Sequence, residues 1–211
     1  MTTTRVLIAD DHPIVLAGLA GLIRPDPGFT VVAEARDGQT ALEEIERLQP
    51  DIAVLDLVMP RLSGLDVLKA TRRSHPSTRC LLLAAMASPS AIYEAVAEQA
   101  AAILLKDMTP NLLLDCLNAI RQGASWPLSE TLRRDFEREG VRRDKWQRLS
   151  GNLTARESEL VQLVLQGLST KAIASATGIA EGTLKIHLNS IFRKLEVASR
   201  SEVMELARDQ R

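Results

Sequence analysis

The first half of the chain alternates between short apolar runs and longer segments in which apolar residues recur with helical spacing. The runs are rich in valine, isoleucine and leucine, a pattern that predicts strands buried on both faces, as in a parallel sheet. The strands are expected at residues 5–9, 30–35, 52–56, 80–84 and 101–105, and the helices at 14–24, 38–48, 64–73, 90–99 and 110–122. Thr109 and Pro110 suit the start of the last helix, as N-cap hydroxyl and first-turn proline. Five strand–helix repeats predict an α/β domain with a doubly wound parallel sheet and helices on both faces.

The pattern changes after residue 123. Trp126 and Pro127 interrupt it, residues 128–138 have the pattern of a polar helix, and residues 139–150 are charged with almost no aliphatic side chains. We therefore expect a domain at 1–123, a partly helical linker at 124–150 and a second domain at 151–211.

The last sixty residues contain no strand pattern and predict a small all-α domain. Thr154 and Glu157 have the spacing of a capping box, which opens a helix that Gly167 ends. Further helices are expected at 170–176, 181–195 and 201–208. A short helix, a turn containing glycine and a second helix form a helix-turn-helix pattern, although other helix pairs share it.

Charged side chains stand at the ends of three of the apolar runs. Asp10 and Asp11 follow the first run, Asp56 ends the third and Lys106 follows the fifth. Polar residues at the carboxyl ends of parallel strands line the ligand crevice, so these four side chains are expected to converge. Carboxylates suit a hard divalent cation, and an ammonium group suits a transferable phosphoryl group. A lone Asp often only starts a turn, and a lysine at a strand end often only reaches for water, but four such charges together predict a site.

Composition narrows the possible function classes. The chain has 211 residues, of which 45% are hydrophobic and 25% charged, an ordinary globular composition for two modest domains. No run approaches the roughly 18 apolar residues of a membrane span, and no signal peptide precedes the first strand, so we expect a cytoplasmic protein with no membrane partner. Cys80 and Cys116 lack metal or redox spacing and are expected to be small core residues.

Net charge is a weak guide to the partner. Residues 1–123 carry 11 Lys or Arg and 15 Asp or Glu, residues 124–150 carry 7 and 5, and residues 151–211 carry 8 and 7. The net charges are therefore −4, +2 and +1. Because +1 alone is little evidence for nucleic acid, the case for DNA depends on where the basic residues lie.

Two sets of motifs resemble known families. Asp10-Asp11, the segment 56–60 (DLVMP) and the segment 105–107 (LKD) match the receiver domain of bacterial response regulators in order and spacing. The segments 153–157 (LTARE) and 181–187 (EGTLKIH) are similar to the LuxR-type DNA-binding domain. Together they resemble the NarL/FixJ family of two-component response regulators, which implies a five-stranded flavodoxin-like receiver followed by a helix-turn-helix domain.

The resemblance implies a phosphorylation site. Asp56 would be the nucleophile that takes a phosphoryl group from a sensor histidine kinase and forms an acyl phosphate. Asp10, Asp11, Asp56 and the backbone carbonyl of Val58 would hold Mg²⁺, and Lys106 would stabilise the phosphoryl oxygens. Beyond this transfer and its own dephosphorylation, no enzyme activity is expected.

The chain departs from the family at the switch positions. Ala84 stands where a Thr or Ser hydroxyl normally follows the phosphoryl group, and Ile103 stands where an aromatic residue is usual. Gln99 and Ala102 replace two usual glycines. A hydrogen bond to a charged group contributes about 1.5–3 kcal/mol, so its loss reduces the active-state bias by roughly 10- to 150-fold. Ser88 is a possible substitute, but the sequence does not place its hydroxyl.

The longer helix of the helix-turn-helix pattern separates its faces. Leu184, Leu188, Ile191 and Leu195 form an inward stripe, while Lys185 and Asn189 lie on another face and suit guanine and adenine. The residues expected to contact double-stranded DNA are Lys171, Thr183, Lys185, Ile186, His187, Asn189, Arg193 and Lys194. Lys171, His187 and Lys194 are expected on phosphates, and binding is expected as a homodimer on a roughly two-fold operator. Ala180 replaces a polar N-cap and Ala172 a usual Glu, so we expect a slightly less stable helix pair.

Four interpretations remain open. The leading one is a phosphorylation-regulated transcription factor; a second is an atypical regulator whose output is set by protein partners or by a constitutive conformation. A third is an interaction protein or phosphate sink. A phosphohydrolase is disfavoured because Val58 stands where a second carboxylate would be needed. His12 is interpreted as the residue before Pro13 at a helix start rather than as a base, because Asp56 attacks already ionised.

Overall fold

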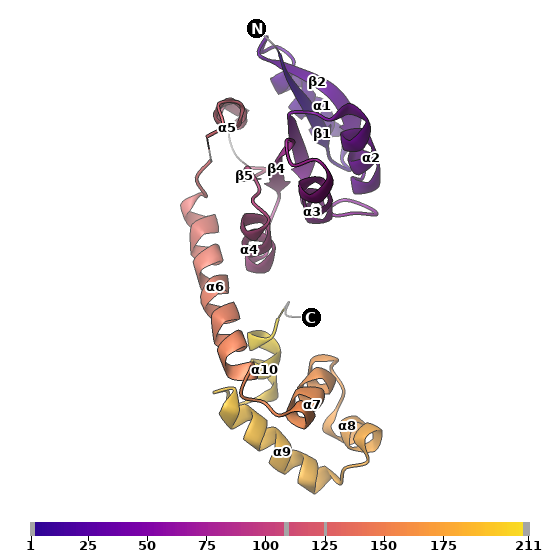
Figure 1. The fold of residues 1–211 in the computed structure, drawn as a ribbon, viewed down its shortest axis with the longest axis vertical. Coiled ribbons are helices and arrows are strands. Elements are labelled where there is room, and N and C mark those ends of the chain that lie inside the picture. Colours follow the sequence, from indigo (N-terminus) through magenta and orange to yellow (C-terminus); the bar gives the residue numbers. More distant parts are fainter. Residues whose placement is uncertain (1–2, 108–109, 125, 209–211) are drawn as a thin grey trace. The chain divides into compact units, whose positions relative to one another are not determined.

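The computed structural model describes residues 3–107, 110–124 and 126–208. The chain divides into two compact units, Met1–Phe136 and Glu137–Arg211. Figure 1 shows the elements of both, and the boundary falls inside helix α6 (Glu130–Ser150). Among the described residues, no helix has both the length and the apolar composition needed to cross a bilayer.

The first unit is built on one parallel sheet, whose strand order in the described residues is β2-β1-β3-β4-β5. The strands are β1 (Thr4–Ala9), β2 (Phe29–Ala35), β3 (Ile52–Asp56), β4 (Arg79–Ala84) and β5 (Ala102–Leu105). The helices are α1 (Pro13–Ile23), α2 (Gly38–Leu48), α3 (Gly64–Ser74), α4 (Pro89–Ala97) and α5 (Pro110–Arg121). The predicted fold class is confirmed. Because the strand order reverses between β1 and β3, the crevice of a doubly wound sheet lies at their carboxyl ends.

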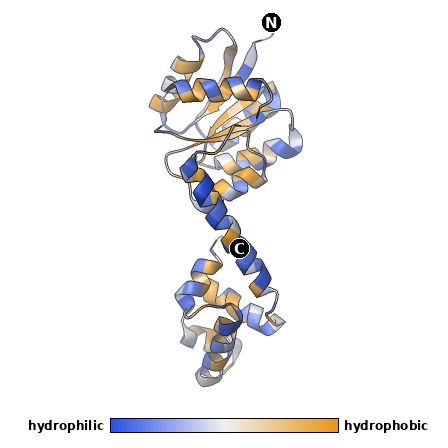
Figure 2. Cartoon of the chain, turned by 90° about the vertical axis from the view of Figure 1, so that its left-hand side faces the viewer, coloured by the Kyte–Doolittle hydropathy of each residue, from blue (hydrophilic) through white to orange (hydrophobic). Residues whose placement is uncertain are grey.

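Alternation along the strands gives the sheet two apolar faces. Val6 and Ile8 of β1 pack into one core with α1 and α5, whereas Leu7 and Ala9 pack into a second core with α2, α3 and α4. Figure 2 shows the strands as a hydrophobic layer between amphipathic helices. Cys80 and Cys116 are both buried in these cores, and burial raises the pKa of each thiol to about 12.

Local hydrogen bonds account for the helix starts. The Asp37 carboxylate accepts the Thr40 N–H at 2.9 Å at the start of α2, and Ser63 opens α3 with a capping box. The predicted N-cap of α5, Thr109, lies outside the described residues. Gln99 adopts a left-handed backbone with φ of 57°, which explains why a glycine suits this position.

Helix α6 differs from the expected polar helix and charged linker, because it is one helix of 21 residues. Glu139 pairs with Arg142 and Arg143, at spacings of three and four residues, and such pairs stabilise a helix that lacks an apolar stripe. The start of α6 belongs to the first unit: Leu132 is buried in the second core, and Phe136 stacks on Tyr93 of α4 at 5.3 Å between ring centroids.

The second unit is a small helical domain with its own core. Its helices after α6 are α7 (Ala155–Leu165), α8 (Thr170–Thr177), α9 (Glu181–Lys194) and α10 (Arg200–Leu206). Leu160, Ile173, Leu184 and Ile191 are buried together in this core. Gly178 ends α8 with φ of 69°, so the turn before α9 uses a conformation that favours glycine.

Candidate functional site

The crevice at the carboxyl ends of β1 and β3 gathers the charged residues expected there. Asp56 is the last residue of β3, and Asp10 directly follows β1, with its N–H donating to the Ala35 carbonyl at 3.1 Å. Gly64 starts α3 against the end of β3. A Cβ at Gly64 would lie 2.2 Å from the Asp56 carbonyl oxygen, so only glycine allows this close packing behind the crevice.

Three carboxylates and one imidazole meet in this crevice. Asp10, Asp11, His12 and Asp56 each offer one ligand atom, and these atoms lie within 4.8 Å of one another. Asp10 is fully buried, Asp56 is 4% exposed and Asp11 is half-buried. Such a cluster of buried acids repels itself unless cations balance the charge.

Lys106 supplies one of these cations. Its N–H donates to the Ala84 carbonyl at 2.8 Å, which fixes the backbone just past β5. Its Nζ lies 2.6 Å from Asp10 Oδ2 and 2.9 Å from Asp56 Oδ2. Burial raises the pKa of Asp56 and the Asp10 carboxylate adds to this, while Lys106 opposes it. Burial alone would lower the pKa of Lys106, but the two carboxylates raise it above its ordinary value, so the lysine stays charged.

The His12 side chain contacts the carboxylates of the crevice, in addition to its expected place at a helix start. It is the N-cap of α1, yet its side chain makes no capping hydrogen bond. Its Nδ1 instead lies 2.7 Å from Asp11 Oδ1 and 3.3 Å from Asp10 Oδ1. The sequence signal was adjacency to the acidic pair, but the direction of the imidazole could not be read from it.

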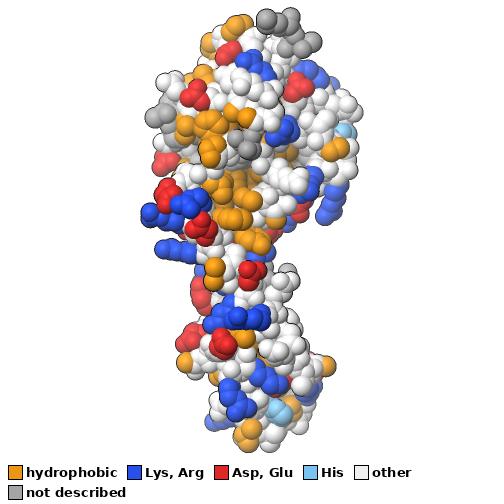
Figure 3. Space-filling model, turned by 60° about the vertical axis from the view of Figure 1, so that its left-hand side comes forward, with side chains coloured by type: hydrophobic (Ala, Val, Ile, Leu, Met, Phe, Trp, Pro, Cys, Tyr) orange, Lys and Arg blue, Asp and Glu red, His pale blue; other side chains and the backbone are white. Residues whose placement is uncertain are grey.

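Helix α9 presents one apolar and one polar face. Leu184, Leu188 and Ile191 are buried in the core, as the inward stripe predicts. On the outer surface of α9, Ile186 exposes 70% of its area. Thr183, Lys185, Asn189 and Arg193 are also exposed, as is Lys171 on α8, whereas His187 and Lys194 are half-buried. Figure 3 shows basic side chains on the surface of this unit. The N-cap residue Ala180 makes no side-chain hydrogen bond, in keeping with the missing polar cap.

Glu157 has a role that its capping-box spacing did not reveal. Its carboxylate accepts the Thr154 N–H at 2.9 Å and also receives Lys194 Nζ at 2.6 Å and the Ser190 hydroxyl at 3.3 Å. The Lys194 ammonium lowers the pKa of Glu157 to about 2, with the Thr154 N–H as the next cause. Lys194 is therefore tied to the core of its own domain, and its expected phosphate contact remains a prediction.

Comparison with known proteins covers both units. Residues 6–118 match the response regulator receiver domain, and residues 151–207 match the bacterial regulatory proteins of the luxR family. The chain belongs to the LuxR-type response regulators. The nitrate/nitrite response regulators NarP and NarL of Escherichia coli K12 are 38% and 35% identical to it. NarP aligns over 94% of this chain and 92% of its own length, and NarL over 93% and 91%.

Solved structures give the same assignment. The RcsB response regulator of Salmonella typhimurium has a TM-score of 0.70 and 25% identity, covering 96% of this chain and 98% of RcsB. RcsB bound to a promoter in the presence of the phosphomimetic BeF₃⁻ has a TM-score of 0.67 and 25% identity, covering 97% and 98%. The family predicted from the motifs is thus confirmed: the chain is a two-component response regulator with a DNA-binding, LuxR-type helix-turn-helix domain.

The two positions expected to act as the switch carry neither a hydroxyl nor an aromatic ring. Ala84 is buried at the end of β4, and Ile103 is buried in the second core beside α4. Ser88 is the N-cap of α4, where its Oγ accepts the Ala91 N–H at 3.2 Å. Its hydroxyl is therefore engaged in capping α4.

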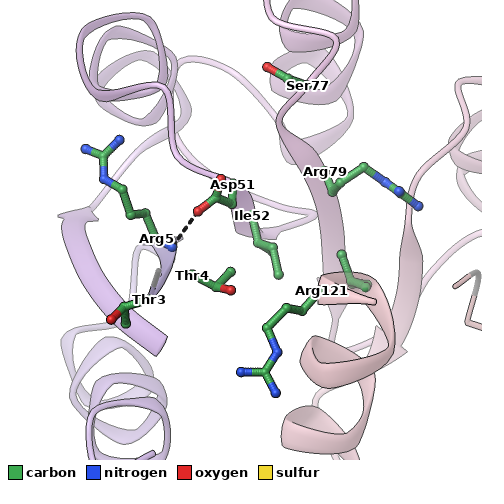
Figure 4. A pocket seen from close by; sticks show the side chains of 9 residues that line it. Thr3, Thr4, Arg5, Asp51, Ile52, Ser77, Arg79 and Arg121 are labelled. Atoms are coloured by element: carbon green, nitrogen blue, oxygen red, sulfur yellow. Dashed lines mark hydrogen bonds between the residues drawn. The ribbon is translucent and has the colours of Figure 1, made fainter. Parts of the chain in front are cut away.

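A cavity lies at the amino ends of the strands, opposite the crevice at Asp56. It has a volume of about 710 Å³ and is lined by Thr3, Thr4, Arg5, Asp51, Ile52, Ser77, Arg79, Ile120 and Arg121. Figure 4 shows that the three guanidinium groups point in different directions. That of Arg5 donates to the Leu48 carbonyl at 2.6 Å, and that of Arg121 lies over the Phe29 ring. Because no set of charges converges in this cavity, the crevice at Asp56 is the candidate site of the first unit.

Proposed function

We propose that this response regulator is a transcription factor whose output is set by phosphorylation of Asp56, with a sensor histidine kinase as donor and Mg²⁺ as cofactor. The observation that carries the proposal is the position of Asp56, buried at a strand end, where Lys106 lies between it and Asp10. A buried carboxylate with an ammonium group 2.9 Å away fits a group that accepts a phosphoryl anion.

The donor set of the crevice fits Mg²⁺. Three carboxylates face one lysine, a formal excess of two negative charges in a largely buried place. Carboxylate and carbonyl oxygens are the ligands that Mg²⁺ prefers, so Asp10, Asp11, Asp56 and the carbonyl of Val58 would hold it. When bound, Mg²⁺ neutralises charge on the phosphoryl group and its donor.

The residues of the chain supply the rest of the transfer. A carboxylate oxygen of Asp56 forms a bond to phosphorus while the phosphorus–nitrogen bond of the phosphohistidine breaks, and the imidazole of the kinase leaves. Lys106 Nζ already lies beside Asp56 Oδ2 and would pair with the phosphoryl oxygens. Asp10 keeps Lys106 in this place, since the same Nζ contacts Asp10 Oδ2.

We place DNA binding on the outer surface of α9. Lys185 and Asn189 are exposed four residues apart, and both side chains match base edges in the major groove. Ile186 stands between them with a free apolar surface that suits a thymine methyl group. A helix-turn-helix protein reads two half-sites one helical turn apart, so the DNA-bound form would be a homodimer.

The test follows phosphorylation and DNA affinity in one experiment. The full chain is incubated with Mg²⁺ and a small phosphodonor such as acetyl phosphate, and both its mass and its affinity for promoter DNA are measured. We expect one phosphoryl group per chain, lost in Asp56→Asn and with chelator, and a change in affinity that follows it. Asp115→Asn, at an exposed position of α5, is the control. Labelling that survives in Asp56→Asn refutes the site, and labelling without any change in affinity indicates a regulator whose output is set by partners.

A further inference from the structure

His12 is a polar N-cap residue whose side chain does not cap its helix. Pro13 follows it at the first helical position, and no hydrogen bond joins the imidazole to the backbone of α1. The His12 N–H donates to Asp10 Oδ1 at 2.9 Å, so the backbone of His12 is already fixed to the acidic pair. The imidazole extends from this anchored residue towards the carboxylates and not back over the helix end.

The imidazole and the carboxylates are arranged around a common point. His12 Nδ1 is aligned as a hydrogen-bond partner with Asp10 Oδ1, at 3.3 Å. Its approach to Asp11 Oδ1 is shorter, at 2.7 Å, but that buried oxygen makes no hydrogen bond with any described residue. A contact this short is favourable when a cation serves both groups, either a proton on the imidazole or a metal ion held by both atoms.

The spacing of the ligand atoms fits an octahedral cation. Neighbouring ligands at about 2.1 Å from such a cation lie about 3 Å apart, and opposite ligands about 4.2 Å apart. The nitrogen–oxygen separations of 2.7 and 3.3 Å fall on either side of the first value. The group of Asp10, Asp11, His12 and Asp56, whose ligand atoms lie within 4.8 Å, has room for the second.

We propose that His12 Nδ1 is a nitrogen ligand of the cation held by Asp10, Asp11 and Asp56, so that this site takes transition-metal cations such as Mn²⁺ and Zn²⁺ in addition to Mg²⁺. The proposal rests on the cation site of the proposed function and adds a ligand to it. Imidazole suits zinc and related metals, and carboxylates suit manganese and magnesium, so a mixed set adds affinity for transition metals to a site that also fits Mg²⁺. Because 65% of the His12 side chain is exposed, the imidazole can turn onto an entering cation.

The test uses Mn²⁺ alone as probe of the full chain. Pulsed electron paramagnetic resonance of bound Mn²⁺ detects a directly coordinated nitrogen through its ¹⁴N coupling. We expect this coupling in the native chain, its loss in His12→Ala and its persistence in His75→Ala, a control histidine at the end of α3. His12→Ala should also weaken Zn²⁺ binding by at least about tenfold while leaving Mg²⁺ affinity nearly unchanged.

The outcomes separate this inference from the proposed function. Mn²⁺ that binds without ¹⁴N coupling, or with coupling that survives His12→Ala, overturns the role of His12 and leaves the phosphorylation site intact. Mn²⁺ binding that Asp11→Asn does not weaken would place the cation elsewhere and overturn both. Equal loss of Mg²⁺ and Zn²⁺ affinity in His12→Ala would show that the imidazole only positions Asp11, which also refutes direct ligation.

Discussion

The ion pair between the buried Glu157 and the half-buried Lys194 gives the sharpest quantitative prediction for the DNA-binding domain. Glu157→Gln keeps the size of the side chain and an oxygen that can accept the Thr154 N–H, but removes the charge opposite Lys194. The pKa of Glu157 is about 2 against an ordinary value of 4.5, and each unit of such a difference corresponds to about 1.4 kcal/mol. Because Lys194 is partly exposed, screening by solvent makes the stabilisation smaller than the full pKa difference implies. We expect Glu157→Gln to lower the free energy of unfolding of this domain by about 2–3 kcal/mol at neutral pH.

The same pair makes the stability depend on pH in a defined window. A carboxyl whose pKa is lower in the folded state stabilises the fold above its unfolded pKa, and this contribution disappears as pH falls through the folded value. The contribution of Glu157 is therefore complete above about pH 4.5 and is lost between there and about pH 2. The difference in unfolding free energy between the native chain and Glu157→Gln should shrink over this interval, whereas other carboxylates act equally on both.

The assay needs a signal from one domain. Trp126 packs against the core of the first unit and Trp146 against that of the second. Urea titrations in a Trp126→Phe background, followed by fluorescence of Trp146, therefore report on the DNA-binding domain. Glu159→Gln is the matched control, because Glu159 pairs with Arg156 at the surface and such pairs contribute at most about 1 kcal/mol. A Glu157→Gln variant as stable as the control at neutral pH, or a difference that persists at pH about 2, would refute the reasoning.

Three further predictions concern recognition and signalling. Lys185→Ala should remove about 1–3 kcal/mol of discrimination between operator and random DNA in binding titrations, and equal losses on both DNAs would make Lys185 a phosphate contact. Ala84→Thr should widen the affinity gap between phosphorylated and unphosphorylated protein; a native gap that is already about 100-fold, or roughly 2.7 kcal/mol, would show that another group does the switching. Alanine substitutions of Tyr93 and Phe136, singly and together, should give a coupling of about 0.5–1.5 kcal/mol in the stability of the first unit, and strictly additive effects would contradict the stacking.

The parts of the fold that follow from periodicity were predictable. The run 52–56 forms β3 with the expected bounds. Asp10 and Asp56 lie close together because β1 and β3 are neighbouring parallel strands, whose carboxyl ends lie side by side. The length of α6 was not predictable in this way. It has no apolar stripe, and its continuity depends on side-chain pairs such as Glu139 with Arg142, which no hydrophobic pattern reveals.

The side-chain partners within the site were also beyond the sequence. Adjacency placed His12 beside the acidic pair but not its imidazole against Asp11, and a capping box placed Glu157 at a helix start but not under Lys194. Both contacts depend on the direction in which a side chain points, and that direction is set by the packing around the side chain. Spacing along a helix or strand gives the face of a residue, whereas its partner across the fold must be observed.

The last prediction concerns how the position of Ile103 is packed in the first unit. Ile103 is buried in the same apolar core as Leu132 of α6. Helix α6 then continues without a break into the second unit. Close-packed interiors respond to displacement by changing between discrete arrangements, so we expect a movement at Ile103 to be felt at Leu132 without a hydroxyl. Ala84→Thr adds a hydroxyl at the end of β4, and a small effect on the affinity gap would indicate that packing already carries most of the signal.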